Sequence, residues 1–400
     1  MMKPIYLYVT PFFPSPRSWR GGYCYDAVKA LMRTGQYDVR VLVPGAGPDY
    51  EYNGVKVGRF QIRQLPFGLA PFVFARFNRR AFLAKIRQLG IDWCDVKICH
   101  VHTIQGAACC EAAKRESPAT KVLLQHHCSG PVRLHAGRLG VLPIHATLLY
   151  VHYCRLCSFA DVHVFVSKKS QETYGKFFNG APEKGWRDIR TQLLLGRWMK
   201  PLPCKKAIVA YNGIDGAVFN ERGRKPHEGF VIGCVANFQP LKDHVTLLRA
   251  FVEVVRQIPD AKLRLVGSGE TLDACKRFAE TNCPEGTVSF EQEVDHLALP
   301  EFYRSLDLFV LPSRFEGFCC AYMEAVGCGT PAMGCKGVSL EEVIPEDERA
   351  NWLVAPCDSH ELAQKIIAYY RKRSEFRLIQ SMKIDDLIGQ FLSDIARLGK

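Results

Sequence analysis

The stretch Arg314-Phe-Glu-Gly-Phe-Cys-Cys-Ala-Tyr-Met-Glu324, continued by Ala-Val-Gly-Cys-Gly-Thr-Pro331, decides the fold class of this chain. An apolar run, Leu306-Asp-Leu-Phe-Val-Leu-Pro312, comes just before it and predicts a buried parallel strand. A tight loop with Gly317 follows, and we expect a helix to begin near Phe318. A buried strand that leads through a short loop into a helix indicates an α/β domain with a parallel sheet.

Two carboxylates flank the start of this expected helix. Glu316 lies just before the first turn of the expected helix, and Glu324 follows about two turns later, at 3.6 residues per turn. Both carboxylates therefore lie near the same face of the helix. The backbone N–H groups of residues 317–320 point out of the helix start, where they favour an anion such as a diphosphate. A carboxylate beside such a site suits a sugar, because the acid accepts hydroxyl hydrogen bonds while the amides hold phosphate.

The composition is that of a globular protein of two or three domains, with 400 residues of which 48% are hydrophobic. No window approaches about 18 uninterrupted apolar residues, so no transmembrane helix is predicted. The first residues become strand-like too soon for a signal peptide. An odd number of cysteines, 17, scattered through the chain favours reduced thiols in the cytoplasm over a disulfide framework. Cys154 and Cys157 lack a second pair at zinc-like spacing, so buried thiols are preferred to a metal site there.

The net charge of +13 is unevenly distributed along the chain. Residues 229–400 hold 19 Lys or Arg and 25 Asp or Glu, whereas residues 1–228 hold 34 and 15, so the charges are −6 and +19. The basic half is predicted to meet something anionic. We find no basic helix, zinc finger or RNA-binding aromatic motif, which argues against nucleic acid. An anionic membrane surface or lipid-linked acceptor fits better, and solvated charge without a partner is the alternative.

Two segments of the basic half are candidates for contact with such a surface. Residues 63–89 mix aromatic residues with arginines, which suits an amphipathic element facing a membrane or acceptor, or equally a core helix with basic outer positions. Residues 176–205 are basic and contain Trp186 and Trp198, as expected of an insertion that touches lipid.

The first half begins in the manner of a doubly wound α/β domain. A strand at residues 4–10, a loop, a helix at about residues 23–33 and a strand at residues 38–44 follow one another. Gly21 and Gly22 allow the backbone to approach a ligand just before a helix N-terminus, although a plain turn is the commoner role of such a pair.

Two further strands of this half end in histidines. Residues 96–102 end in His102, and residues 121–127 end in His126 and His127. Ligands of open α/β sheets lie beyond the carboxyl ends of the strands. These histidines are therefore better placed for binding than most, although packing or capping is the usual role of any single histidine.

The second half repeats the strand-loop-helix pattern. A strand at residues 206–215 ends in an Asn-Gly turn, and residues 216–228 are polar and suit a linker. The next strand, residues 230–236, leads into a loop where Lys242 can place a cation on phosphate near a helix start. A later strand ends in a Gly-x-Gly-Glu sequence at residues 267–270, a weak pattern shared with dinucleotide sites.

The Glu-x7-Glu pattern of Glu316 and Glu324 resembles the motif of retaining glycosyltransferases of family 4 (glycosyl transferases group 1). The resemblance covers nearly the whole chain, because the glycine loop, strand-end histidine, Asn-Gly-Ile-Asp junction, lysine loop and Gly-x-Gly occur in the same order. It implies the GT-B fold, with two Rossmann-like doubly wound domains facing across a cleft. The implied parts are an acceptor domain 1–215, a linker 216–228, a nucleotide-sugar domain 229–373 and a C-terminal helix within 374–400 that packs on the first domain.

The resemblance also implies the roles of individual residues. Glu316, Lys242 and His127 would be catalytic, with His126 as the competing assignment for His127 and His102 as a weaker candidate. The donor would be bound by Gly21, Gly22, Asn237, Gly267, Gly269, Gly317, Phe318, Cys319, Cys320 and Glu324.

The implied reaction moves a sugar from a nucleotide sugar to a hydroxyl of a glycan or lipid-linked acceptor, with retention of configuration. The resemblance implies neither a metal nor another cofactor. It places the enzyme in cell-surface polysaccharide or glycolipid synthesis, in the cytoplasm or peripherally on the inner face of the membrane. The sugar, the base and the acceptor are not predicted.

One departure from the family pattern affects the phosphate site. Relatives usually carry an arginine a few residues before the lysine, whereas this chain has Asn237 and Gln239 there, and Arg20 or Arg314 would have to replace it. A sugar-nucleotide epimerase of the same fold and an inactive sugar-nucleotide-binding subunit are the alternatives. A nicotinamide dehydrogenase is disfavoured, because no Gly-x-Gly-x-x-Gly follows the first strand.

Overall fold

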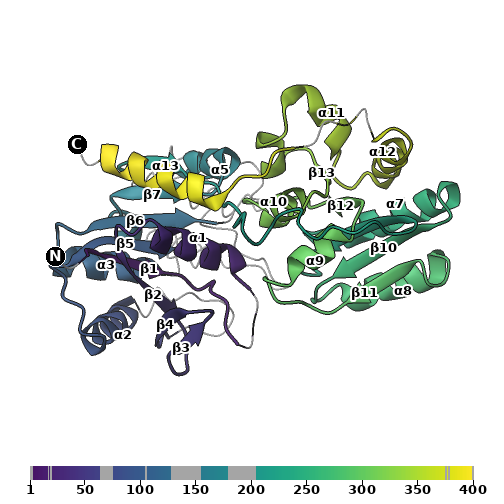
Figure 1. The fold of residues 1–400 in the computed structure, drawn as a ribbon. Helices are drawn as coiled ribbons and strands as arrows, with labels where there is room; N and C mark the ends of the chain where they lie inside the picture. Colours follow the sequence, from purple (N-terminus) through teal and green to yellow (C-terminus); the bar gives the residue numbers. More distant parts are fainter. Residues whose placement is uncertain are drawn as a thin grey trace, which may run out of the picture. The chain divides into compact units, whose positions relative to one another are not determined.

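A computed structural model of the chain describes residues 3–16, 18, 20–63, 75–103, 106–127, 155–178, 204–373, 376 and 379–398. The chain forms two compact units. Residues 1–211 and 388–400 make up the first, and residues 212–387 make up the second. Each unit contains a largely parallel sheet with helices on both faces (Figure 1). The predicted α/β class with two doubly wound domains is therefore confirmed.

The sheet of the first unit has the strand order β3-β4-β2-β1-β5-β6-β7-β8. Among its described strands, only β3 runs antiparallel, against β4. The order reverses direction between β1 and β5, because the chain first builds outward through β2 and then returns to the other side of β1. The strands are β1 (Ile5–Val9), β2 (Asp38–Pro44), β3 (Tyr50–Tyr52), β4 (Val55–Phe60), β5 (Val96–His102), β6 (Lys121–His126), β7 (Val162–Phe165) and β8 (Ala207–Val209).

Two layers of helices cover this sheet (Figure 1). Ile5, Leu7 and Val9 of β1 belong to an apolar cluster with residues of α2 and α3. Tyr6 and Tyr8 point to the opposite face, because side chains alternate along a strand, and that face lies under α1 and α13. The helices are α1 (Gly22–Arg33), α2 (Ala75–Gln88), α3 (Ala107–Glu116), α5 (Lys168–Phe178) and α13 (Ile384–Arg397).

The sheet of the second unit has the order β11-β10-β9-β12-β13-β14, and all its described pairs are parallel. Its central strands β9, β12 and β13 are apolar and almost wholly buried, as expected of a sheet covered on both faces. The strands are β9 (Phe230–Val235), β10 (Ala261–Val266), β11 (Val288–Glu291), β12 (Leu308–Leu311), β13 (Ala332–Cys335) and β14 (Leu353–Val354).

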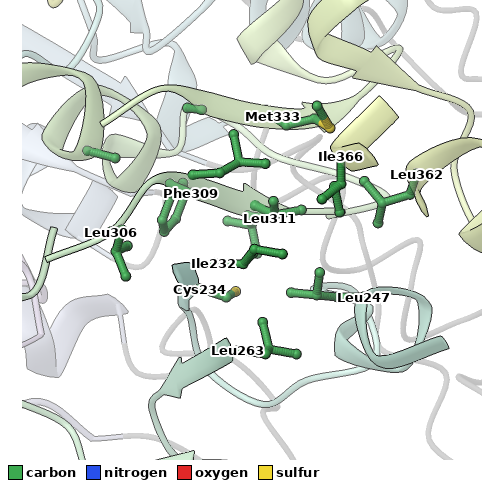
Figure 2. Packing of buried hydrophobic residues seen from close by; sticks show 14 of the residues in the cluster. Ile232, Cys234, Leu247, Leu263, Leu306, Phe309, Leu311, Met333, Leu362 and Ile366 are labelled. Carbon is green, nitrogen blue, oxygen red and sulfur yellow. The ribbon is translucent and has the colours of Figure 1, made fainter. Parts of the chain in front are cut away.

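A large apolar core holds the second unit together (Figure 2). Leu247 of α7 and Leu362 and Ile366 of α12 pack with the strand residues Ile232 and Leu311, and all five are fully buried. The helices are α7 (His244–Gln257), α8 (Leu272–Asn282), α9 (Leu299–Arg304), α10 (Cys320–Gly327), α11 (Arg349–Trp352) and α12 (Ser359–Arg371), with 3-10 turns at Ser339–Glu342 and Glu346–Glu348.

The structure differs from the predicted linker at residues 216–228. Phe219 is only 1% exposed and belongs to the core of the second unit. Arg224 donates hydrogen bonds to the Leu306 carbonyl and, at 3.1 Å, to Thr330 Oγ1. This segment is polar in sequence but anchored, and the first crossing between the units comes earlier, after Tyr211.

The C-terminal helix predicted within residues 374–400 begins at Ile384, as α13. Lys383 forms a parallel bridge with Ile214, and the Ile384 amide donates to the Ile214 carbonyl at 2.8 Å. Residues 388–400 belong to the first unit, and Phe391 lies against His100 there.

Three predicted features lie partly or wholly outside the described residues: the aromatic and arginine-rich segment at 64–74, the basic insertion at 179–203, and Cys154. The described remainder of the first segment is α2, which buries Phe82 and Ile86 in the core. Over the ranges described, no helix is both long and apolar enough to span a bilayer.

Candidate functional site

The predicted phosphate-binding residues of the second unit gather where its strand order reverses. From β9 the chain first builds outward to β10 and β11, and later returns to the other side of β9 with β12. The loops after β9 and β12 therefore diverge at the carboxyl edge of the sheet, which is the general ligand-binding position of open α/β sheets. Lys242 lies in the first loop and Glu316 in the second.

Lys242 and Glu316 form an ion pair across these two loops. Nζ of Lys242 lies 2.6 Å from Oε1 of Glu316. The lysine side chain is 20% exposed and the glutamate side chain 9%. The pair thus connects the β9–α7 loop with the β12–α10 loop, and both side chains are nearly withdrawn from water.

The electrostatics of this pair involve a neighbouring thiol. Burial alone would lower the pKa of Lys242, but Cys319 and then Glu316 raise it above its ordinary value. Burial also raises the pKa of the Cys319 thiol to about 12, so the thiol is protonated at neutral pH. Glu316 is therefore the group that holds the lysine as a cation under physiological conditions.

Arg314 also connects the two loops, through contacts separate from the ion pair. Its backbone amide donates to the Leu241 carbonyl at 2.9 Å, and its guanidinium donates to the Pro240 carbonyl. Its Nε lies 3.6 Å from Oδ2 of Asp243, which has the left-handed conformation (φ 53°) that Asp tolerates better than most residues. Arg314 was one candidate for the missing phosphate arginine, and in this structure it is already engaged with the β9–α7 loop.

Gly267 and Gly269 shape the loop after β10 against the loop after β9. Their φ angles are +145° and +148°, and a Cβ atom at these positions would lie 2.1 Å from the Ala236 carbonyl oxygen and 2.4 Å from that of Phe238. The Phe238 amide donates to Ser268 O at 2.8 Å. Only glycine allows this approach, and the packing places Asn237 beside the Gly-x-Gly turn.

The helix after β12 starts two residues later than predicted. Cys319 is extended (φ −91°, ψ 109°) and is the N-cap of α10, whose first residue is Cys320. The predicted donor residues Gly317 and Phe318 consequently lie in the loop, and the expected amide site at 317–320 covers the end of the loop and the first helical residue.

Glu324 projects from α10 into a buried polar cluster that the sequence did not reveal. Its Oε2 accepts a hydrogen bond from the Tyr303 hydroxyl at 2.7 Å, and Nδ1 of His296 lies 3.9 Å from Oε1. Tyr303 is fully buried and His296 is 4% exposed. Tyr303 lies on α9, so only the tertiary packing of α9 on α10 brings the hydroxyl to the carboxylate.

The remaining predicted residues lie in the first unit, at its own point of reversal beside β1 and β5. Gly21 is the N-cap of α1 with φ +94°, and a Cβ there would lie 2.5 Å from the Phe12 carbonyl carbon. Gly22 is the first residue of the helix. The rings of Phe12 and Tyr23 lie 5.8 and 5.4 Å from that of His127, so the glycine loop and the histidine are neighbours.

His126 and His127 point into different surroundings. His126 is buried, and its Nε2 lies 2.9 Å from Nδ1 of His163 on β7. His127 is half-buried, and its Nε2 lies 2.8 Å from Nδ1 of His102 on β5. His126 is a packed core residue, whereas His127 lies beside the glycine loop.

The structure thus assembles two groups of predicted residues, each within its own unit. The second unit brings together Lys242, Glu316, Glu324 and the loops that carry Asn237 and the Gly-x-Gly turn. Across the part of the chain that the structure describes, no three His, Cys, Asp or Glu side chains are arranged to hold a metal ion.

The second unit matches a known family. Residues 218–382 match the family model described as Glycosyl transferases group 1. This match covers β9 through β14 and therefore includes both loops that hold the Lys242–Glu316 pair. The class of protein that this region resembles is thus the glycosyl transferases group 1.

Individual relatives agree with this class. The chain is 29% identical over 121 residues to the GDP-mannose-dependent alpha-(1-6)-phosphatidylinositol monomannoside mannosyltransferase of Mycolicibacterium smegmatis, covering 28% of this chain and 32% of that protein. The matched parts span about a third to a half of the length of such curated relatives.

Solved structures show the same fold at low sequence identity. Sucrose-phosphate synthase of Thermosynechococcus elongatus has a TM-score of 0.71 and 19% identity over 99% of both chains. HepE of Anabaena, in complex with UDP and glucose, has a TM-score of 0.65 and 17% identity over 99% of this chain and 100% of its own. These likenesses support the GT-B fold.

Proposed function

We propose that this chain is a retaining glycosyltransferase of family 4 that moves a sugar from a nucleotide sugar to an acceptor hydroxyl. The observation that carries the proposal is the Lys242–Glu316 pair, which places one cation and one carboxylate at the carboxyl edge of β9 and β12. A nucleotide sugar carries a charged diphosphate next to neutral hydroxyls, and this pair offers a partner to each.

The leaving group requires positive charge. When the bond between the anomeric carbon and the phosphate oxygen breaks, the electron pair stays on the nucleoside diphosphate. Lys242 and the N–H groups at the start of α10 would stabilise that charge. Since Arg314 is held by Asp243 and Pro240, Lys242 would carry most of the cationic role in this unit.

The acceptor hydroxyl is the attacking group. The acceptor hydroxyl oxygen forms the new bond on the face that the diphosphate leaves, and its proton passes to the departing phosphate oxygen. Configuration is thereby retained, and neither a carboxylate nucleophile nor a metal ion is needed. Glu316 would orient the hydroxyls of the donor sugar, and Glu324, fixed by Tyr303, would serve the ribose hydroxyls. His127 would contact the sugar near the reacting carbon.

The donor and acceptor are proposed by class. The mycobacterial relative is named for GDP-mannose, and HepE was solved with UDP and glucose. UDP-glucose and GDP-mannose are therefore the first donors to test. The acceptor we propose is a glycan or a lipid-linked glycan, in the synthesis of cell-surface polysaccharide or glycolipid.

A peripheral location in the cytoplasm, on the inner face of the membrane, is the further part of this proposal. Helix α2 contains five basic residues and no acidic one, and Arg76, Arg80 and Arg87 are exposed on it. Such a surface suits anionic lipid. Replacing these three arginines with glutamate should weaken cosedimentation with phosphatidylserine vesicles, while equal sedimentation of both proteins would contradict this part.

A transfer assay with purified protein tests the main proposal. UDP-glucose and GDP-mannose are incubated with and without membrane lipid extract, and products are followed by mass spectrometry. Transfer requires a product heavier than the acceptor by one sugar residue. An isomerised nucleotide sugar formed without acceptor would favour the epimerase, and donor binding without any reaction would favour an inactive subunit.

A further inference from the structure

A buried layer of polar and aromatic side chains lies in the first unit, on the sheet face covered by α1 and α13. Its members are Tyr6, Tyr8, Cys24, His100 and His102, all at most 3% exposed. His102 is 1% exposed and forms the end of this layer toward His127, with 2.8 Å between its Nδ1 and Nε2 of His127. The two rings are nearly parallel, at 24°.

One proton lies between these two nitrogens, and the surroundings of His102 indicate its position. Among the described residues, Nε2 of His102 is buried and has no hydrogen-bond partner. If His102 carried its proton on Nε2, a buried donor would have no acceptor, which is rarer in proteins than an unfilled acceptor. The arrangement with the proton on Nδ1 avoids this, because Nδ1–H then donates to His127.

The rest of the layer is compatible with a hydrogen bond that His102 donates to His127. Cys24 Sγ lies 4.0 Å from the same Nδ1 of His102, and Thr10 Oγ1 lies 3.6 Å from that sulfur. The thiol can direct its own proton to Thr10 and leave its sulfur as a second, weaker acceptor for the His102 N–H. His100 is engaged separately, with its Nδ1 2.7 Å from the Tyr6 hydroxyl.

We propose that His102 is a positioning residue that holds His127 in the tautomer protonated on Nδ1, so that His127 offers an N–H donor to a hydroxyl oxygen of the donor sugar. Because Nε2 of His127 accepts from His102, its own proton must lie on Nδ1. The nitrogen presented to a ligand is then a neutral donor. The link to the sugar rests on the proposed function, whereas the tautomer itself does not.

The charge state of the pair agrees with this assignment. Burial lowers the pKa of His127 to about 3, and burial together with His100 and His127 lowers that of His102 well below its ordinary value. Among the described residues, the titratable side chains placed against the pair are Tyr8, Tyr23, Cys24 and His100, and none of them is an acidic carboxyl or a lysine or arginine. A neutral donor suits a sugar hydroxyl, which carries no charge.

Nitrogen-15 NMR of the histidine-labelled full chain tests the tautomer without any substrate. The His127 signals are identified by their loss in His127→Gln. At neutral pH we expect Nδ1 of His127 to be protonated and Nε2 to be bare, and we expect His102→Phe to abolish this preference. A protonated Nε2 on His127, or an unchanged preference in His102→Phe, would overturn the proposal.

Kinetics with the donor that the wild type uses, UDP-glucose or GDP-mannose, test the consequence. His102→Phe should lower kcat/KM about 10-fold, the effect of losing one oriented hydrogen bond. His102→Asn, whose amide N–H reaches the position of Nδ1, should recover most of it, and the control Tyr6→Phe should match the wild type. Equal loss in the Phe and Asn variants would show a packing role and overturn the proposal. If the wild type transfers no sugar, the proposed function fails, and the NMR spectrum of the wild type still decides the tautomer of His127. The same spectrum decides the tautomer if His102→Phe does not fold.

Discussion

Removing the cation opposite Glu316 should destabilise the second unit by an amount that a double-mutant cycle can isolate. Two unit charges about 4 Å apart attract by about 4 kcal/mol at an effective dielectric constant of about 20. Desolvation offsets part of this gain, so we expect a coupling energy of about 2 kcal/mol between Lys242→Met and Glu316→Gln. The single change Lys242→Met should cost more, about 3 kcal/mol, because it leaves the glutamate, 9% exposed, without its cation.

A matched control is available in the same unit. Lys336 and Glu361 lie 3.4 Å apart, with side chains 53% and 27% exposed. The same cycle there should give at most about 0.5 kcal/mol, since water screens an exposed pair.

Hydrogen-exchange mass spectrometry on peptides from β9 and α7 is the suitable assay. It reports the opening free energy of the second unit and does not assume that both units unfold together. Equal coupling energies in the two cycles would refute the argument, because they would show that burial at the β9 and β12 edge does not strengthen the pair.

Three further outcomes are expected. Gly269→Ala should destabilise the second unit by at least about 2 kcal/mol more than Gly286→Ala. A Cβ atom at residue 269 would lie 2.4 Å from a backbone oxygen, whereas a Cβ atom at residue 286 would meet no atom. Equal melting temperatures of the two variants would contradict this expectation. Tyr303→Phe should weaken UDP binding, measured by calorimetry, about 10-fold, because the Glu324 carboxylate loses the hydrogen bond that orients it. Unchanged binding would show that Glu324 does not contact the nucleotide. The folded-state pKa values of His100 and His127, about 3, lie below the unfolded value of about 6.5, so the unfolded chain takes up protons first on acidification. Stability of the first unit should thus be complete above about pH 6.5 and fall by about 1.4 kcal/mol per histidine per pH unit below it, and a flat calorimetric profile between pH 7.5 and 5.5 would exclude this.

The sequence predicted the sheets and the loop residues because local patterns determine them. The apolar runs before Lys242 and Glu316 form β9 and β12, and the turn and helix signals after them place both side chains at the same edge of one sheet. The fold class followed from the alternation of strands and helices, which needs no knowledge of distant contacts.

Other features of the site depend on contacts that no local pattern encodes. The Tyr303 hydroxyl reaches Glu324 only through the packing of α9 on α10. Residues 216–228 have the composition of a linker, yet Phe219 is buried in the core of the second unit. The helix start at Cys320 was missed because Cys319, which could have been helical, is extended.

The most direct test of the central claim compares sugar transfer by the wild type, Glu316→Ala and Lys242→Ala, with Lys336→Ala as the control. Product formation from UDP-glucose or GDP-mannose with membrane lipid extract is measured by mass spectrometry. We predict transfer by the wild type and the control, and a loss of at least about 100-fold in turnover for the two site variants, the usual effect of removing one group that stabilises developing charge. Wild-type turnover in both site variants would contradict the assignment of the reaction to the β9 and β12 edge.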